Sequence, residues 1–294
     1  MPLQTHSRAW LTVCLVAIGG VVAVASPDPH LERATELYQR TAYREALRLL
    51  DAAPAKTALT YELMGKCYYR LEEFSEATDA LEKAVAADPQ NANDWDWLGK
   101  AYGRRAETSS FLTAPRYAVK AREHFERALA LDALNQEALS DLFDYYLEAP
   151  GFLGGGVDKA TVLSERIRDR DASKYHAMKA RLAEKRKAFP QAEQFWRQAA
   201  QLAPGQAGRF VDLAKFLARR GRFSESDEEF ERAAKIAPDN AELKFERAKT
   251  YVEAKRNSAL ARRLLDEYLK SPLTPDDPPR TEAEKLLKTI ARTG

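Results

Sequence analysis

Two distant stretches of the sequence align with each other along their whole length without a gap. They are YELMGKCYYRLEEFSEATDALEKAVAADP, from Tyr61, and FVDLAKFLARRGRFSESDEEFERAAKIAP, from Phe210. Equivalent positions recur at a spacing of about 34 residues, as at Pro204 and Pro238. Each copy holds two runs with the apolar spacing of an amphipathic helix. A repeat of this length predicts an all-α chain of helix-turn-helix units stacked in one array, rather than separate globular domains.

Two units carry an ordered pattern of small and large apolar residues. In the first it is Tyr61, Met64, Gly65, Tyr68, Ala77, Leu81, Ala84 and Pro89, and in the second Trp95, Leu98, Gly99, Tyr102, Ala121, Phe125 and Ala128. In this order the chain resembles the tetratricopeptide repeat family. The resemblance implies a right-handed superhelical solenoid of about seven helix-turn-helix repeats.

The register of the pattern divides the chain. We expect a solenoid over 26–272, with units at about 27–57, 58–91, 92–135, 136–172, 173–206, 207–240 and 241–272. The remainder, 273–294, begins with the proline-rich break SPLTPDDPPR, which cannot continue a helix. The following segment, Thr281 to Arg292, is amphipathic and predicts a capping helix over the end of the array.

The N-terminal segment, 1–25, has the order of a secretory signal peptide. Arg8 precedes an apolar run that ends in Ala23-Val24-Ala25. The sequence therefore predicts an exported, periplasmic protein; the alternative is an inner-membrane anchor formed by residues 9–25. With 46 basic and 44 acidic residues, the charge gives no general attraction to nucleic acid.

The glycine-rich stretch EAPGFLGGGVDKA, at 148–160, is the main candidate for chemistry. Counted as a phosphate-binding loop, it has Val157 and Asp158 where lysine and a hydroxyl are needed, and no strand precedes it. Two interpretations stay open: a joint between helices, which is favoured, or backbone N–H groups that bind an anion. Exported bacterial tetratricopeptide proteins have a joint similar to Pro150–Ala160. His30, His124 and His176 lack metal-ligand spacing, so no enzyme, cofactor or metal site is predicted.

The resemblance also implies which side chains face the concave groove, because the ninth and thirteenth positions of a repeat commonly project there. At the ninth positions these are Lys66, Lys100, Asp144, Arg181, Lys215 and Lys249; at the thirteenth they are Arg70, Arg104, Glu148, Lys185 and Arg219. Two basic clusters thus flank an acidic middle unit. One interpretation is a groove that captures an extended segment or C-terminal tail with acidic groups, with Tyr69 and Tyr145 as apolar contacts. The alternative is that these charged side chains are only solvated and bind no partner. The ninth positions hold no asparagine, which argues against a chaperone-type carboxylate clamp.

Two insertions between the helices of consecutive units interrupt the period. The first contains Phe111, Leu112 and Tyr117, and the second contains Phe152 and Leu153. Such side chains either cover the neighbouring unit or form a partner site; covering is favoured for the first insertion, because an exposed apolar patch is a liability.

These patterns together predict a non-enzymatic periplasmic or envelope scaffold that binds proteins or extended peptides through its concave groove. The alternative is an accessory ligand- or partner-binding subunit of a solute transport system. No nucleic acid is expected as a partner, and membrane contact is expected only through an uncleaved N-terminal segment. The sequence leaves the oligomeric state open.

Overall fold

The computed structural model describes residues 28–293, and the N-terminal segment expected to be a signal peptide lies outside this part. Over the described residues the chain is all-helical, with seven consecutive helix pairs and a final helix, as the repeat predicted. The pairs are α1 (Pro29–Gln39) with α2 (Tyr43–Ala52), α3 (Ala58–Arg70) with α4 (Phe74–Ala87), α5 (Ala92–Thr108) with α6 (Ala114–Leu131), α7 (Gln136–Glu148) with α8 (Val157–Glu165), α9 (Ala172–Lys185) with α10 (Phe189–Leu202), α11 (Ala207–Arg219) with α12 (Phe223–Ile236), and α13 (Ala241–Glu253) with α14 (Ser258–Lys270).

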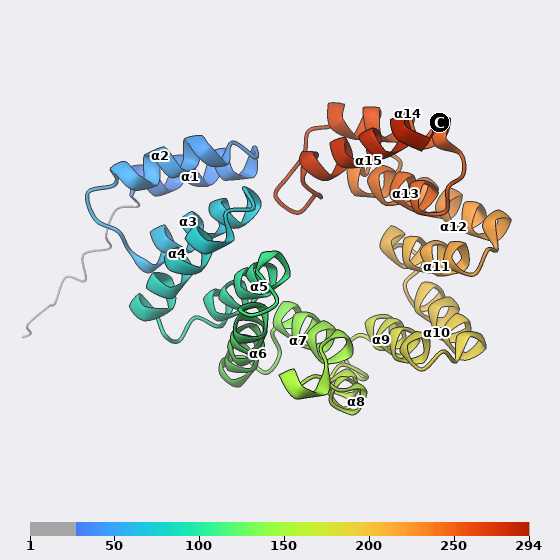
Figure 1. Cartoon of the computed structure of the whole chain (residues 1–294), viewed down its shortest axis with the longest axis horizontal. Coiled ribbons are helices and arrows are strands. Elements are labelled where there is room, and N and C mark those ends of the chain that lie inside the picture. Colours follow the sequence, from blue (N-terminus) through green and yellow to red (C-terminus); the bar gives the residue numbers. More distant parts are fainter. Residues whose placement is uncertain (1–27, 294) are drawn as a thin grey trace, which may run out of the picture.

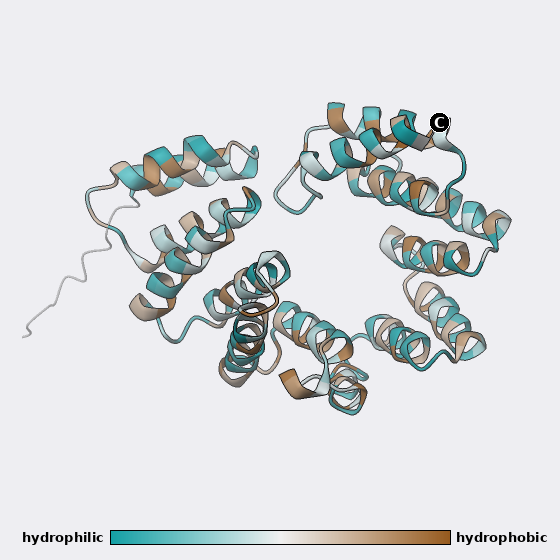
Figure 2. Cartoon of the chain, in the orientation of Figure 1, coloured by the Kyte–Doolittle hydropathy of each residue, from teal (hydrophilic) through white to brown (hydrophobic). Residues whose placement is uncertain are grey.

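Each pair is held together where a small residue of one helix meets a large residue of the other. Gly65 of α3 faces Leu81 of α4, and Gly99 of α5 faces Phe125 of α6. A methyl group added at Gly99 would lie 2.5 Å from the Phe125 ring, so any side chain there would force the helices apart. Along each helix, apolar positions alternate with hydrophilic ones (Figure 2), and the apolar positions form clusters shared between neighbouring pairs.

The standard turn between paired helices has one residue in the left-handed conformation. This residue is Thr41, Glu72, Lys187, Gly221 or Lys255, with φ between 51° and 73°; the turn before α14 has a second such residue, Asn257, with φ of 52°. The N–H group of the residue that follows each of the five donates to a carbonyl in the last turn of the first helix, as the N–H of Glu73 does to the carbonyl of Tyr68. Only one of the five is glycine, so the hydrogen-bonded turn offsets a small conformational cost at the others.

The C-terminal helix α15 (Arg280–Thr293) covers the last pair, as the amphipathic pattern predicted. Its Ala283 and Ile290 are buried in a cluster with Phe245, Leu265 and Tyr268. The proline-rich segment before it is fixed by the Tyr268 hydroxyl, which donates to the carbonyl of Pro278. The exposed apolar end of the solenoid is thereby closed.

The stack curves so far that its two ends meet (Figure 1). Thr281 Oγ1 donates to Glu72 Oε1 at 3.2 Å, and Lys285 Nζ lies 3.8 Å from Glu72 Oε2. Between the ends is a cleft of about 350 Å³, lined by Tyr43, Arg44, Arg70, Leu71, Leu273, Pro278 and Arg280 among others. We call this contact the seam. Its polar contacts are partly exposed, and such contacts contribute little stability individually.

Substitutions at two glycines of α5, Gly99 and Gly103, test whether close packing of α5 against α6 requires a residue without a side chain. Gly99→Ala should lower the free energy of unfolding by about 1–3 kcal/mol, because the added methyl overpacks against Phe125. Gly103→Ala should raise it by up to about 1 kcal/mol, since no atom lies within 4 Å of a methyl there and alanine favours the helix. Denaturant unfolding followed by circular dichroism measures both, and equal effects of the two substitutions would contradict the packing argument.

Zero-length carbodiimide cross-linking tests the seam. An amide should form between Lys285 and Glu72, whose charged atoms lie 3.8 Å apart. Lys100 and Glu137, at 2.9 Å, provide an internal positive control within the solenoid. Peptide mass spectrometry should detect both cross-links in the monomer fraction, and Glu72→Gln should abolish only the first. Detection of the control cross-link alone would show that the ends do not meet in solution.

Candidate functional site

The first helices of the pairs line the concave face, with the second helices outside (Figure 1). Helices α7, α9 and α11 form a hollow of about 530 Å³ on this face. Its lining contains four acidic and four basic side chains: Asp144, Glu148, Glu184, Asp212, Arg181, Lys185, Lys215 and Arg219. The sequence register therefore brings six of its expected groove residues to one hollow.

Those charges pair with one another between successive units. Asp144 accepts from Arg181. Lys185 donates to Glu148, and Arg219 to Glu184, at 2.8 Å each. Lys215 lies 2.6 Å from Glu246 of the next unit. The interpretation of an acidic unit set apart from two basic clusters is therefore wrong. Asp144 and Glu148 each pair with a cation of the unit that follows, and Glu137 and Asp141 pair with Lys100 of the unit before.

An aromatic patch occupies the groove at the N-terminal end, on α3 and α5. The rings of Tyr69 and Trp97 pack edge to face with centroids 5.5 Å apart. Three cations lie over Trp97, at 5.2 Å for Lys66, 5.7 Å for Arg70 and 4.8 Å for Lys100. Sequence reasoning missed Trp97, although it lies three residues before Lys100 and so shares its helix face. We call these five residues the Trp97 patch.

Arg70 has no carboxylate partner among the described residues, unlike most of the other cations expected in the groove. Lys66 pairs with Glu62, Arg104 with Glu107, and Lys100 with Asp96, Glu137 and Asp141. Within residues 28–293 no carboxylate pairs with Arg70 or Lys249, and the Arg70 Nε is buried without a hydrogen bond. Arg70 also lines the seam cleft, so an anionic group there would meet a guanidinium without a carboxylate partner.

Carboxylates near the lysines of the patch were not foreseen: the buried Asp94 and Asp96 of α5, and the partly buried Asp141 of α7. Asp94 is fully buried, and neither of its oxygens has a hydrogen-bond partner among the described residues. Burial, reinforced by the Glu62 carboxylate, raises the pKa of Asp94 to about 7. Burial likewise raises the pKa of Asp96, and that of Asp141 to about 6, against the opposing charge of Lys100. Both aspartates of α5 stand near its start, where acidic residues usually serve the helix dipole, so their spacing carried no separate signal.

The thiol and the imidazoles serve packing. Burial raises the pKa of Cys67 to about 12, which leaves the thiol protonated and unreactive. His124 lies between the rings of Trp95 and Tyr102, at 5.4 and 5.3 Å. Burial lowers the pKa of His124 to about 4, so the ring is neutral. Among the described residues no group of His, Cys, Asp and Glu is arranged to hold a metal ion.

The glycine-rich stretch is a joint. The N–H groups of Gly154, Gly155 and Gly156 donate to the carbonyls of Gly151, Pro150 and Tyr146, respectively. None of the three remains for an anion, so the open alternative of an anion cradle is wrong. Gly154 adopts the left-handed conformation, with φ of 88°, after a short 3-10 turn, η1 (Gly151–Leu153).

Tyr145 is part of this joint, and its expected place in the groove is wrong. Its hydroxyl donates to the carbonyl of Leu153 at 2.8 Å. The same carbonyl accepts from Arg122 of α6, and Lys159 donates to the carbonyl of Gly154. The lengthened connection is thus fixed by side chains of three helices.

The covering role expected for the first insertion holds only in part. Tyr117 is half-buried, stacks on Tyr102 and lies beneath the guanidinium of Arg105. Phe111 and Leu112 are 84% and 76% exposed, so for these two the expectation is wrong. In the second insertion Leu153 is partly buried and Phe152 is 82% exposed.

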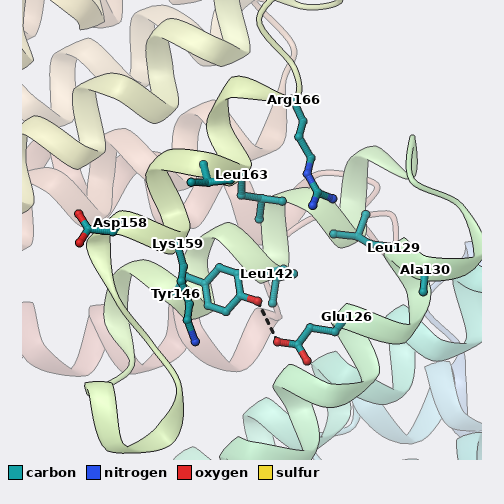
Figure 3. Close-up of a pocket in the computed structure, with 10 residues that line it drawn as sticks. Glu126, Leu129, Ala130, Leu142, Tyr146, Asp158, Lys159, Leu163 and Arg166 are labelled. Carbon is teal, nitrogen blue, oxygen red and sulfur yellow. Dashed lines mark hydrogen bonds between the residues drawn. The ribbon is translucent and has the colours of Figure 1, made fainter.

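A second hollow, of about 660 Å³, lies between α6, α7 and α8 (Figure 3). Leu129, Leu142 and Leu163 form its apolar wall, and the Tyr146 hydroxyl donates to Glu126 at 2.8 Å across one side. The sequence did not predict this hollow, because it depends on how the shortened α8 sits between its neighbours.

The fold and its concave groove define a helical-repeat protein of the solenoid class, in which paired helices stack without a central core. Residues 58–91 match the family model of the tetratricopeptide repeat. The fold is similar to a tetratricopeptide repeat protein of Parabacteroides merdae (16% identity, 89% of this chain and 97% of that chain, TM-score 0.58). It is also similar to human IFIT1, solved as a dimer with PPP-AAAA (17% identity, 71% of this chain and 54% of that chain, TM-score 0.50).

At these identities the likeness concerns the fold. None of the curated proteins matches the chain. The matched unit is a tetratricopeptide repeat, and the described chain as a whole has the architecture of proteins built from such repeats. Across residues 28–293, no helix is both long enough and apolar enough to cross a bilayer.

Asp94 gives the stability a defined pH dependence. Its folded-state pKa of about 7 lies above the usual unfolded value of about 3.9, so the folded chain binds the extra proton and stability falls as pH rises from about 4 to 7. Asp94→Asn should remove this fall and be more stable than the wild type at pH 8, by up to about 4 kcal/mol, with little difference at pH 4. Urea unfolding at the two pH values measures it. Asp141 titrates in both proteins, so its contribution cancels when the two free energies of unfolding are compared. An equal difference in stability at pH 4 and pH 8 would refute the raised pKa of Asp94.

Proposed function

We propose that the protein is a non-enzymatic scaffold whose concave groove binds an extended segment of another protein. The observation that carries the proposal is the Trp97 patch, with Arg70 lacking a carboxylate partner beside it. Aromatic rings and arginine are the residues that most often anchor protein interfaces. An apolar side chain of the segment would pack on Trp97 and Tyr69, and a carboxylate would pair with Arg70.

The charged hollow on α7, α9 and α11 sets a second requirement on the segment. Its ion pairs are partly exposed, with Lys185 and Glu148 at 38% and 63%, so a ligand can exchange with them at little cost. A purely acidic segment would displace the carboxylates and leave them unpaired. A segment of alternating charge fits this part, and the acidic group belongs at Arg70.

The alternative is an accessory subunit of a solute transport system that holds a small ligand. The hollow on α7, α9 and α11 and a smaller one between α11 and α13 are open and lined by many charged side chains, whereas small-molecule sites usually enclose an apolar ligand. This difference favours the scaffold.

Export to the periplasm is part of the proposal and rests on the order of residues 1–25. N-terminal sequencing of the protein from cells distinguishes a chain that starts near Ser26 from one that keeps residues 9–25 as an anchor.

Charge reversal in the groove tests the scaffold. Cross-linking and capture from envelope extracts should identify a partner that binds the wild-type chain. Arg70→Glu and Trp97→Ala should each weaken its purified complex by about tenfold or more, measured by calorimetry, because each removes an anchor. Trp97→Ala also requires a check of unfolding, since the ring is half-buried.

The matched control is Lys235→Glu, which reverses an exposed cation of α12 on the outer side of the solenoid. It should leave the affinity unchanged. If Lys235→Glu weakened binding and Arg70→Glu did not, the partner would bind the outer surface and the groove proposal would fail.

A further inference from the structure

The two insertions carry the most exposed large apolar side chains of the described residues. Phe111, Leu112 and Phe152 are 84%, 76% and 82% exposed, whereas the other large exposed ones, such as Leu59 and Leu202 on helices and Leu134 in a turn, are less exposed and occur singly along the chain. Isolated apolar residues are normal on a surface, but aromatic residues gathered at loop tips need an occupant. We propose that this edge of the solenoid docks on a lipid bilayer with anionic headgroups.

The topology brings the two insertions to one edge. Each joins the first helix of a unit to its second, and these connections fall on the same side in successive units of a solenoid. Arg122 of α6 donates to the carbonyl of Leu153 at 3.4 Å, which ties the second insertion to the helix that follows the first. In Figure 2 brown, the colour of hydrophobic residues, appears within the α5–α6 connection and in the segment between α7 and α8.

Local hydrogen bonds hold both tips in shape. In the first, the N–H groups of Thr113 and Ala114 donate to the carbonyl of Ser110, at 3.0 and 2.9 Å. In the second, η1 presents Phe152 outward while Leu153 turns inward. A tip fixed before contact loses little conformational freedom on insertion. Both tips expose apolar side chains, which suits the soft interface of a bilayer.

Charge complementarity identifies the lipid. Residues 108–122 and 149–160 together hold four Lys/Arg and one Asp/Glu, against 46 and 44 in the whole chain. Arg116 lies one turn after Leu112, is exposed, and has no carboxylate partner among the described residues. A cation beside inserted apolar side chains is placed to meet an anionic headgroup.

This surface goes beyond the expectation that the membrane is met only through an uncleaved N-terminal segment. It lies at the edge of the solenoid and not on the concave face. A chain docked by this edge therefore keeps its groove open to a protein partner.

A fluorescent probe at the edge tests the proposal independently of the N-terminal segment. In the full chain with Cys14→Ser, Ser110→Cys is labelled with an environment-sensitive nitrobenzoxadiazole dye; buried Cys67 does not react. Vesicles of phosphatidylcholine with phosphatidylglycerol should shift its emission to the blue, and nitroxide lipids should quench it. Gln90→Cys, in the α4–α5 connection at the opposite edge, is the matched label and should not respond.

Variants separate the apolar and charged contributions. Phe152→Ser with Arg116→Glu should weaken the partitioning detected at residue 110 by at least about tenfold. Leu59→Ser with Leu202→Ser, which removes exposed apolar side chains elsewhere, should leave it unchanged. The proposal fails if the probe at 110 remains water-exposed on anionic vesicles, if the probe at 90 responds equally, or if only a protein partner shields residue 110.

Discussion

The close approach of paired helices is the constraint on which the whole molecule depends. It requires a residue without a side chain, or nearly so, at one position of the first helix and a large apolar residue opposite, as at Gly99 and Phe125. Each pair so formed still exposes apolar surface on both sides, which only the next pair can bury. Stacking is therefore obligatory, the first helices are placed on one face, and α15 is needed at the end.

The helices could be predicted from the sequence because their signals are local. Apolar spacing, small residues and terminal prolines each act within one unit, and together they predict the seven pairs and the cap. The seam could not be predicted in this way. It joins residues 209 positions apart, Glu72 and Thr281, and it depends on the sum of small rotations between all the units.

The sequence predicted which side chains line the groove, but not which of their charges are paired. The register located Arg181 and Asp144 on the concave face at equivalent ninth positions, and they form an ion pair; they are 37 residues apart because the unit at 136–172 is three residues longer than the repeat. The pairs of Lys185 with Glu148 and Lys100 with Glu137 have the same separation. Other partners, such as Glu137 for Lys100 and Glu184 for Arg219, lie outside the ninth and thirteenth positions. A list of those positions alone therefore shows basic clusters where the structure has paired charges.

The departures from the repeat explain where binding surfaces can arise. A regular unit uses its apolar residues for stacking and its charges for ladders with the next unit, and little remains unsatisfied. Among the side chains left over by stacking and by the ladders are Arg70 at the seam, and Phe111, Leu112 and Phe152 in the insertions. Because stacking does not require Phe111, Leu112 and Phe152, their exposure has no structural explanation within the solenoid, and this is the reason for proposing that the insertions dock on a surface.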